Sequence, residues 1–250
     1  MTGFDRPLKP TWIYNFVKIV EIGDTITDHK TEFNKILWEL DGEEGKRKVR
    51  TVLSRYFMKT QKNPKSKTVE YTPIIEICKT YPLEKIRPLM LFYLLSRSEV
   101  LRNLSKIINE VYGNKKDIDY HFLRKKIIEK YGERDISSRS LRNFLTTLEY
   151  FDILKKQNHI YKWTKKLQPD EMNICYMLKF YSDEYKRSPQ IFIDDIEQYI
   201  MQYFEIQDLG SIGRKYNKKL WEFSQNLNQK QIVFHKSYKW ENKLIKQLFS

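Results

Sequence analysis

The side chains best suited to chemistry in this sequence lie between Ser138 and Thr147, and the chemistry they suit is recognition of nucleic acid. Arginine and asparagine can form paired hydrogen bonds with base edges, and threonine can contact a phosphate or a thymine methyl group. Four apolar residues at helical spacing would occupy the buried face of a helix: Leu141, Phe144, Leu145 and Leu148. The remaining faces carry the candidate DNA contacts: Ser138, Arg139, Arg142, Asn143, Thr146 and Thr147.

The helix that carries these residues needs neighbouring elements to hold it. Apolar residues from Ile118 to Ile128 predict a preceding helix, which Gly132 would end. Ser137 or Ser138 would cap the next helix, because a serine side chain can accept a hydrogen bond from an unpaired amide of the first turn. Asp152 follows that helix where the chain must turn, and aspartate tolerates a left-handed backbone better than most residues.

A short hairpin is predicted next, with strands at 153–156 and 160–163 around Gln157-Asn158-His159. Two helices followed by a hairpin are the plan of a winged helix-turn-helix, although similar arrangements also occur in protein-docking domains. The predicted wing would bring five lysines to a DNA backbone: Lys155, Lys156, Lys162, Lys165 and Lys166.

A second basic surface is predicted on a helix that starts near Glu43 and ends near Lys59. Its acidic residues lie at the start and its basic residues toward the end, as the helix dipole favours. Arg47 and Arg50 fall on or near the exposed side and could hold a phosphate backbone. Runs of charge on helices are more often solvated faces without a ligand.

The overall charge agrees with a polyanionic partner. The excess of 46 basic over 32 acidic residues leaves a formal net charge of +14. A field of this sign attracts a polyanion over long range, and salt suppresses the attraction. A basic proteome or a ribosome-associated role would produce the same excess, so the charge does not establish DNA binding by itself.

Motifs of an enzyme or a cofactor site are missing from the sequence. There is no glycine-rich phosphate loop, no ordered Ser/His/Asp set and no cluster of metal ligands. Cys78 and Cys175 lie in apolar helical contexts, which indicates buried free thiols. No apolar run is long enough to cross a bilayer, and no secretory signal is visible. We therefore expect a cytoplasmic, non-enzymatic protein with no catalytic residue, metal, cofactor or small-molecule substrate and no membrane partner.

These patterns predict a mainly α-helical fold with a central winged helix-turn-helix and one or two short β-hairpins. Three domains are expected: an N-terminal helical domain at 1–60, helices leading into the winged helix at 69–167, and a C-terminal helical domain at 168–250. The polar, aperiodic segment 61–68 would link the first two domains.

Further boundaries are predicted within these domains. Pro82 and Pro88 would each mark the edge of a helix, because a proline disfavours a helical residue before it. Two helices are expected after Pro169, at about 170–186 and 189–204. The last segment contains a short basic helix and a strand-like run, and it could form a second, degenerate helix-plus-hairpin unit.

The motifs Tyr81-Pro82-Leu83 and SSRSLRNFLTTLEYFDIL, the second starting at Ser137, resemble the BrxA family of small accessory proteins in bacterial BREX phage-defence systems. The second motif is also shared by winged helices in general. The resemblance implies a non-enzymatic protein that binds double-stranded DNA and acts beside a methyltransferase and other defence-system proteins.

Two classes of function follow from the sequence. In the first, the protein binds double-stranded DNA, with the Arg139 helix in the major groove and the lysine wing on the flanking backbone; a transcriptional regulator would work in the same way. In the second, an adaptor or scaffold docks a partner protein through the same region. A continuous positive face with Arg139, Asn143 and Thr146 exposed would favour the first, and a large exposed apolar patch the second.

Overall fold

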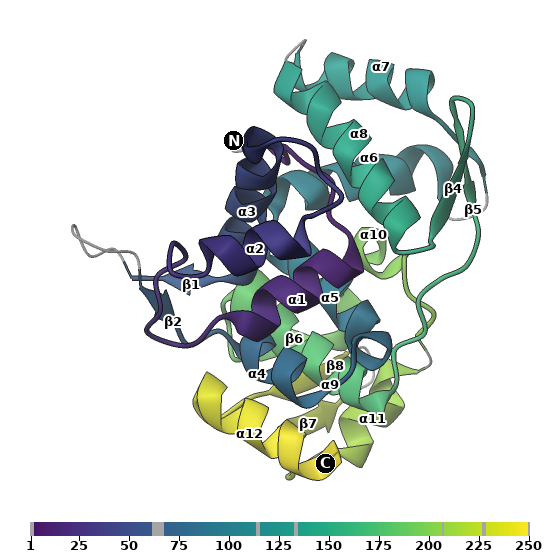
Figure 1. The fold of residues 1–250 in the computed structure, drawn as a ribbon. Coiled ribbons are helices and arrows are strands. Elements are labelled where there is room, and N and C mark those ends of the chain that lie inside the picture. Colours follow the sequence, from purple (N-terminus) through teal and green to yellow (C-terminus); the bar gives the residue numbers. More distant parts are fainter. Residues whose placement is uncertain are drawn as a thin grey trace.

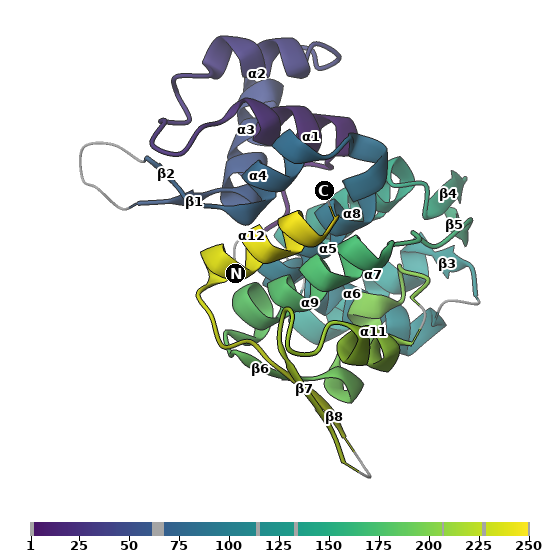
Figure 2. The ribbon, with the colours of Figure 1, turned by 90° about the horizontal axis from the view of Figure 1, so that it is seen from below.

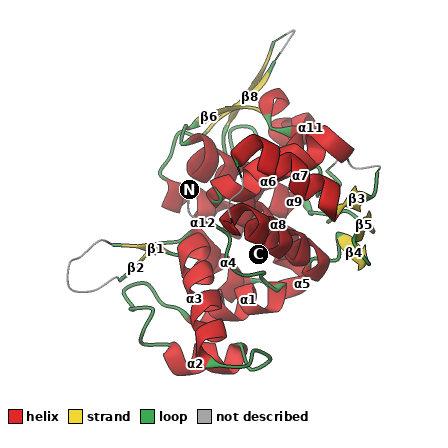
Figure 3. Ribbon diagram, turned by 90° about the horizontal axis from the view of Figure 1, so that it is seen from above, coloured by secondary structure: helices red, strands yellow, loops and turns green. Residues whose placement is uncertain are grey.

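The computed structural model describes residues 3–61, 68–113, 116–132, 135–206, 208–226 and 229–249. Within these ranges the chain is mainly α-helical with three small antiparallel sheets, which confirms the predicted fold class at that level (Figure 3). All but the first and last residues of the predicted linker at 61–68 fall outside the described residues.

Three helices form the N-terminal part, as predicted: α1 (Pro10–Ile19), α2 (Lys30–Ile36) and α3 (Glu43–Phe57). In α3 the apolar residues Val49, Val52 and Leu53 are buried, which leaves its charged residues toward solvent. Two short strands then pair antiparallel across the predicted linker, β1 (Lys59–Thr60) with β2 (Val69–Glu70).

The next three helices form the middle of the molecule: α4 (Pro73–Thr80), α5 (Leu83–Arg97) and α6 (Glu99–Tyr112). Pro82 precedes α5 as predicted, but Pro88 lies inside that helix rather than at its edge. A proline in a helix interior removes one backbone hydrogen bond. The side chains from Leu89 to Leu95 are all buried, and this burial stabilises α5 beyond the proline.

The segment after α6 forms the predicted helices and hairpin. It contains β3 (Ile118–Asp119), α7 (Tyr120–Tyr131), α8 (Asp135–Tyr150), β4 (Leu154–Gln157) and β5 (Ile160–Trp163). Both β3 and β4 pair with β5, so the sheet order is β3-β5-β4. Asp152 has the predicted left-handed backbone, with φ of 58°, and Asn158 in the hairpin turn has φ of 56°.

The two helices predicted after Pro169 are only partly right. Asp170 caps α9 (Glu171–Phe180), which continues into a π-helical segment, η1 (Tyr181–Lys186). In place of the helix predicted at 189–204, the chain forms β6 (Gln190–Phe192), the 3₁₀ turn η2 (Ile193–Asp195) and the short helix α10 (Gln198–Met201). Pairing of β6 with a strand much later in the sequence overrides the local helical pattern.

The end of the chain adds α11 (Leu209–Lys215), β7 (Glu222–Gln225), β8 (Lys230–Val233) and α12 (Tyr238–Phe249). Both β6 and β7 pair with β8, so this sheet has the order β6-β8-β7. A second helix-plus-hairpin unit is therefore present. Its elements from α9 to β8 repeat the order of helices and strands from α6 to β5, and the two sheets lie on different sides of the molecule (Figure 2).

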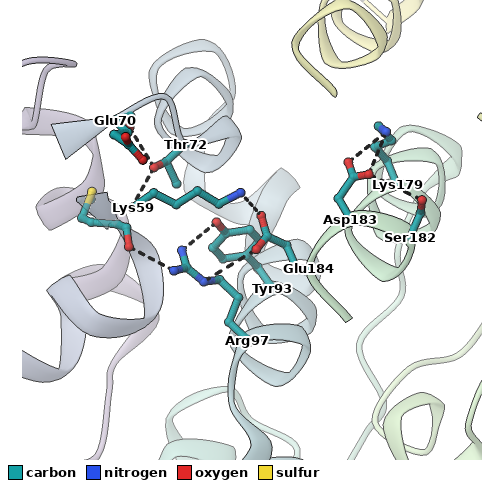
Figure 4. A network of polar contacts seen from close by, with 10 residues as sticks. Lys59, Glu70, Thr72, Tyr93, Arg97, Lys179, Ser182, Asp183 and Glu184 are labelled. Carbon is teal, nitrogen blue, oxygen red and sulfur yellow. Dashed lines mark hydrogen bonds and ion pairs between the residues drawn. The ribbon is translucent and has the colours of Figure 1, made fainter. Parts of the chain in front are cut away.

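One cluster of buried apolar side chains extends from Phe4 to Ile245 and includes residues of all three predicted domains. Polar contacts join the same parts of the chain (Figure 4). Lys59 in β1 pairs with Glu184 in η1 at 2.6 Å, and Arg97 of α5 lies 3.9 Å from the same carboxylate. These contacts tie the N-terminal helices to the C-terminal part.

A buried ion cluster holds α12 against α9. The Lys179 side chain is only 3% exposed, and its ammonium group pairs with Asp183 at 2.9 Å and with Glu241 of α12 at 2.5 Å. Removing one partner of a buried pair leaves an uncompensated charge, which is strongly destabilising. The position of the last helix is therefore fixed by charge as well as by apolar packing.

Candidate nucleic-acid interface

The described part of α8 has three faces: one is buried in the core, one is covered by the N-terminal segment and one is open to solvent. The face predicted to form the core is fully buried, and it consists of Leu141, Phe144, Leu145 and Leu148. The apolar pattern of the sequence thus correctly oriented the helix against α6, α7 and the small sheet.

The second face of α8 is covered by the N-terminal segment, residues 3–8. The backbone N–H of Phe4 donates to Ser140 Oγ at 2.9 Å, and Asn143 Nδ2 donates to the Phe4 carbonyl at 2.8 Å. Further along the helix, the N–H of Leu8 donates to Thr147 Oγ1 at 3.0 Å. The N-terminal segment is therefore held on α8 by hydrogen bonds to Ser140, Asn143 and Thr147, of which Asn143 and Thr147 were predicted to contact DNA.

Asn143 and Thr147 do not have the exposure that the sequence predicts, since they are 6% and 0% exposed. Their polar groups satisfy backbone groups of the N-terminal segment, which would otherwise be buried without partners. Helical periodicity correctly placed both residues away from the apolar core face. It could not show that a distant part of the chain folds over them.

The start of α8 also differs from the prediction. The helix begins at Asp135, so Ser138 lies within its first turns instead of capping it. Ser138 is half-buried, and its Oγ accepts a hydrogen bond from Arg124 Nε of α7 at 3.1 Å. This contact joins the two helices.

The third face of α8 is open and carries Arg139, Arg142 and the half-buried Thr146. The helix lies between α3 on one side and the hairpin β4–β5 on the other (Figure 1). On the α3 side a cavity of about 410 Å³ is lined by Asp5, Arg6, Arg47, Lys48, Thr51, Arg139, Arg142 and Asn143. The fold thus brings Arg47, Arg139 and Arg142 to one site, although α3 and α8 are far apart in the sequence.

The cavity is strongly basic, since five of its eight lining residues are cationic and one is acidic. The acidic residue, Asp5, lies 3.7 Å from Arg55, which does not line the cavity. The side chains of Arg47, Arg139 and Arg142 have no hydrogen-bond or ion-pair partner among the residues that the structure describes. Their charge is therefore available to a ligand.

Glu44, which does not line the cavity, partly offsets the positive charge of the cavity. Lys48 pairs with Glu44 at 2.5 Å, and this hydrogen bond, with the charge of Lys48, holds the pKa of Glu44 below its usual value of 4.5. Arg47 and Arg6 lower the same pKa through their charge, which places the Glu44 carboxylate close to both. Glu44 is exposed to solvent, so its field at the cavity is screened.

Arg50, the other predicted cation of α3, lies outside the cavity. Its guanidinium donates to Asn34 Oδ1 of α2 at 3.1 Å. Conversely, Arg6 and Lys48 were not among the predicted contacts. Lys48 belongs to the basic run that contains Arg47, whereas Arg6 reaches the site because the N-terminal segment crosses from α3 to α8, and no local pattern reports such a crossing.

The hairpin divides the predicted wing lysines between its two faces. Lys156 is paired across the strands with Tyr161, and Lys155 with Lys162. Residues directly opposite each other share a face of the sheet, and successive residues alternate. Tyr161 is buried, and the Lys156 ammonium lies 5.7 Å from the centre of its ring. Lys156 is therefore on the inner face of the hairpin, and Lys155 and Lys162 are on the outer face.

The inner face of the hairpin adjoins the open face of α8. Burial raises the pKa of Tyr161 to about 12, Glu149 of α8 adds to the shift and Arg142 opposes it, so all three groups are close together. The backbone N–H of Lys156 donates to the Glu149 carboxylate at 2.8 Å. Lys156 and Arg142 therefore belong to one surface.

Lys165 and Lys166 are not on the hairpin, because β5 ends at Trp163. Both line a hollow of about 680 Å³ that also includes Arg87 and Phe204. The following residue, Leu167, donates its backbone N–H to the Tyr203 carbonyl at 3.0 Å. This part of the chain joins the C-terminal unit, which is the segment from α9 to β8. These two lysines are therefore separated from the other predicted contacts.

The corresponding helix of the C-terminal unit, α11, carries basic side chains that are paired with acids. Arg214 lies 3.7 Å from Asp208, and Lys215 lies 2.6 Å from Glu171. Lys215 and Tyr216 hold the pKa of Glu171 below its usual value through hydrogen bonds. The two units share an order of elements but differ in the availability of their positive charge.

In the described part of the chain, no group of three or more His, Cys, Asp or Glu side chains is arranged to hold a metal ion. Cys78 and Cys175 are free and buried, as predicted, and burial raises the pKa of both thiols. None of the described helices is long and apolar enough to cross a membrane.

The chain matches no protein-family model, and no curated protein and no solved structure matches it. The relation to the BrxA family therefore stays a prediction that rests on the two sequence motifs.

Proposed function

We propose that this protein binds double-stranded DNA without catalysing a reaction, and that the segment from α6 to β5 is a winged helix. The order helix, strand, helix, helix, strand, strand and the sheet order β3-β5-β4 support this assignment. In helix-turn-helix proteins the recognition helix lies in the major groove. Here α8 takes that place, and the hairpin β4–β5 lies along the flanking backbone.

The open face of α8 is the observation that carries the proposal. Arg139 and Arg142 are exposed, and neither has an acidic partner among the described residues. Arg47 on one side and Lys156 on the other extend the positive surface beyond the helix itself. Cations without acidic partners can contact phosphates or guanine edges without first breaking an ion pair. Because Asn143 and Thr147 are covered, we leave both out of the proposed contact surface.

The adaptor alternative has less support from the described surface. Its large exposed apolar side chains are spread over the loop after α1, the end of α2, α7 and α12: Ile22, Trp38, Phe122, Trp240 and Leu248. Of these, only Phe122 of α7 lies in the predicted winged-helix region, where a docking surface was expected, so they form no patch there. The motif resemblance to BrxA favours a role beside other proteins of a phage-defence system, and it is the sole support for that role.

The first test is the salt dependence of DNA binding. Several contacts between cations and phosphates release counterions, so the log–log slope of affinity against salt should exceed about 2 in magnitude. Replacing Arg139 and Arg142 with alanine should cost about 1–3 kcal/mol for each arginine that reads a base. Fluorescence anisotropy with a labelled duplex at roughly 50–200 mM salt measures both quantities.

A control variant that loses the same charge distinguishes the contribution of the proposed surface to DNA binding from the contribution of net charge. Lys219 and Lys243 are exposed, lie in the C-terminal part and have no ion-pair partner among the described residues. The double variant Lys219→Ala, Lys243→Ala removes the same charge and should bind DNA nearly as the parent does. Affinity that is flat across the salt range, or an equal loss in both double variants, would contradict the proposed surface.

A further inference from the structure

We propose that the cavity between the N-terminal segment, α3 and α8 is a phosphate-binding site. The ligand is a phosphate group, carried either by a nucleic acid strand or by a small phosphorylated molecule. The site shares Arg47, Arg139 and Arg142 with the proposed DNA surface, but a phosphate can occupy it whether or not a duplex lies on α8.

Arginines from three separate segments line the cavity. Arg6 comes from the N-terminal segment, Arg47 from α3, and Arg139 and Arg142 from α8. Arginine presents a planar fork of N–H donors that matches the oxygens of a phosphate in pairs. A single carboxylate has too few oxygens and too little charge to partner four such groups, whereas a phosphate carries three acceptor oxygens and up to two charges.

The walls of the cavity are held in place by contacts that do not use these guanidinium groups. The Arg55 guanidinium of α3 donates to the Gly3 carbonyl at 3.0 Å, and the rings of Phe4 and Tyr56 lie 5.8 Å apart. On the other side, Ser140 and Asn143 of α8 bond to the backbone of Phe4. A site whose walls are fixed in advance loses little entropy when a ligand binds.

One donor beside the cavity lacks a partner. Arg6 Nε is buried, and it forms no hydrogen bond with any described residue. A buried donor without a partner is unfavourable, and the mutual repulsion of neighbouring cations adds to the unfavourable energy. An anion in the cavity would remove the repulsion between the cations. Asp5 does not provide this compensation, because its carboxylate lies beside Arg55.

The cavity also has the right size. Its volume of about 410 Å³ is many times the roughly 30 Å³ that one water molecule takes in the liquid, so a phosphate group fits together with the sugar or other group attached to it. Thr51 of α3 also lines the cavity, but its hydroxyl donates to the Arg47 carbonyl at 2.9 Å and so is not free to donate to an anion.

The test compares two arginines on the same helix. Arg47 lines the cavity, and Arg50 is bonded to Asn34 outside it. The full chain and the variants Arg47→Ala and Arg50→Ala are melted with increasing inorganic phosphate at constant ionic strength. A ligand that binds the folded state raises the melting temperature by mass action, whereas general salting-out by phosphate acts on all three proteins alike.

We expect phosphate to raise the melting temperature of the parent and of Arg50→Ala, and the phosphate affinity of Arg47→Ala to fall about tenfold or more. An equal rise in all three proteins would overturn the proposal. That result would leave the salt dependence of duplex binding untouched, so failure of the phosphate site is distinguishable from failure of DNA binding.

The source of the phosphate is decided by a second arm with a labelled duplex. If Arg47→Ala weakens duplex binding and Arg50→Ala does not, the phosphate belongs to the nucleic acid strand. If Arg47→Ala loses inorganic phosphate but binds the duplex like the parent, the site takes a small phosphorylated molecule. Both results support the phosphate site.

Discussion

At the scale of single residues, the polar side chains of α8 perform two different tasks. Arg139 and Arg142 are exposed and have no acidic partner among the residues that the structure describes, whereas Asn143 and Thr147 are buried and bonded to the N-terminal segment. Arginine and asparagine are equally suitable for base recognition in principle. Solvent access, which depends on what else packs on the helix, decides which of them is available.

Thr147→Val should therefore lower stability rather than DNA affinity. The substitution keeps the shape of the side chain but removes the acceptor of the buried Leu8 N–H. An unsatisfied buried donor costs about 1–3 kcal/mol, so the free energy of unfolding in urea should fall by that amount. Duplex affinity, measured where the variant is fully folded, should stay within the error of the parent value.

Thr146→Val is the matched control, because Thr146 is the neighbouring half-buried threonine and its side chain forms no hydrogen bond with described residues. It should leave the free energy of unfolding nearly unchanged. Should Thr147→Val prove as stable as the parent and alter sequence preference, Thr147 would contact DNA and the N-terminal segment would have to leave α8 on binding.

At the scale of elements, the hairpin is asymmetric. Alternation along β4 places Lys156 on the inner face beside Tyr161 and α8, and Lys155 on the outer face opposite Lys162. Like charges directly opposite each other on a sheet are unfavourable. The five predicted wing lysines therefore do not act as one group, and Lys156 is the one that adjoins the open face of α8.

Lys156→Ala should weaken duplex binding more than Lys162→Ala does. A lysine that contacts a phosphate contributes about one unit to the salt slope, so the slope should fall by about 1 for Lys156→Ala and change little for Lys162→Ala. Because lysine has no planar fork for paired base contacts, the loss should be similar for duplexes of different sequence. Anisotropy titrations with two duplexes measure this, and a larger loss for Lys162→Ala would mean that the outer face of the hairpin faces the DNA.

At the scale of the whole molecule, the segment from α6 to β5 and the segment from α9 to β8 have the same order of elements and share one core. Polar contacts join them: the Arg102 guanidinium of α6 lies 4.6 Å from the centre of the Tyr185 ring, and Tyr203 Oη donates to Ser105 Oγ at 2.9 Å. Tyr185 in turn donates to Glu197 at 2.8 Å. The position of the C-terminal unit relative to α6 depends on this network.

Glu197 makes this network sensitive to acid. Burial would raise its pKa, but hydrogen bonds from Tyr181, Tyr185 and Lys186 outweigh burial and lower the pKa below its usual value of 4.5. A depressed pKa in the folded state means that the carboxylate stabilises the fold above pH 4.5, and that this contribution is lost as the pH falls through the folded value.

Glu197→Gln should therefore reduce the free energy of unfolding at neutral pH by about 1–2 kcal/mol, allowing for the partial exposure of the site. The difference from the parent should shrink as the pH falls below 4.5. Urea unfolding at several pH values measures it, with Glu222→Gln as control because Glu222 is exposed and its side chain has no partner among the described residues. A difference that stays constant into acid would show that charge is not the cause.

Local patterns in the sequence were sufficient for much of the fold. The apolar residues of α8, the hairpin β4–β5 and the left-handed Asp152 depend on neighbours within a few turns of the chain, so periodicity and turn chemistry predicted them. The same patterns failed at Pro88 and at β6, where burial and pairing with distant residues override local preference.

The composition of the candidate site, in contrast, was decided by tertiary structure. The sequence by itself determined that α8 carries arginines away from its apolar face. Only the folded chain decided that residues 3–8 cover Asn143 and Thr147, that Arg6 and Arg47 join Arg139 in one cavity, and that Arg50 does not. The physical reason is that helical periodicity fixes the direction of a side chain from its own helix, whereas its exposure and its charged neighbours depend on which distant segment packs beside it.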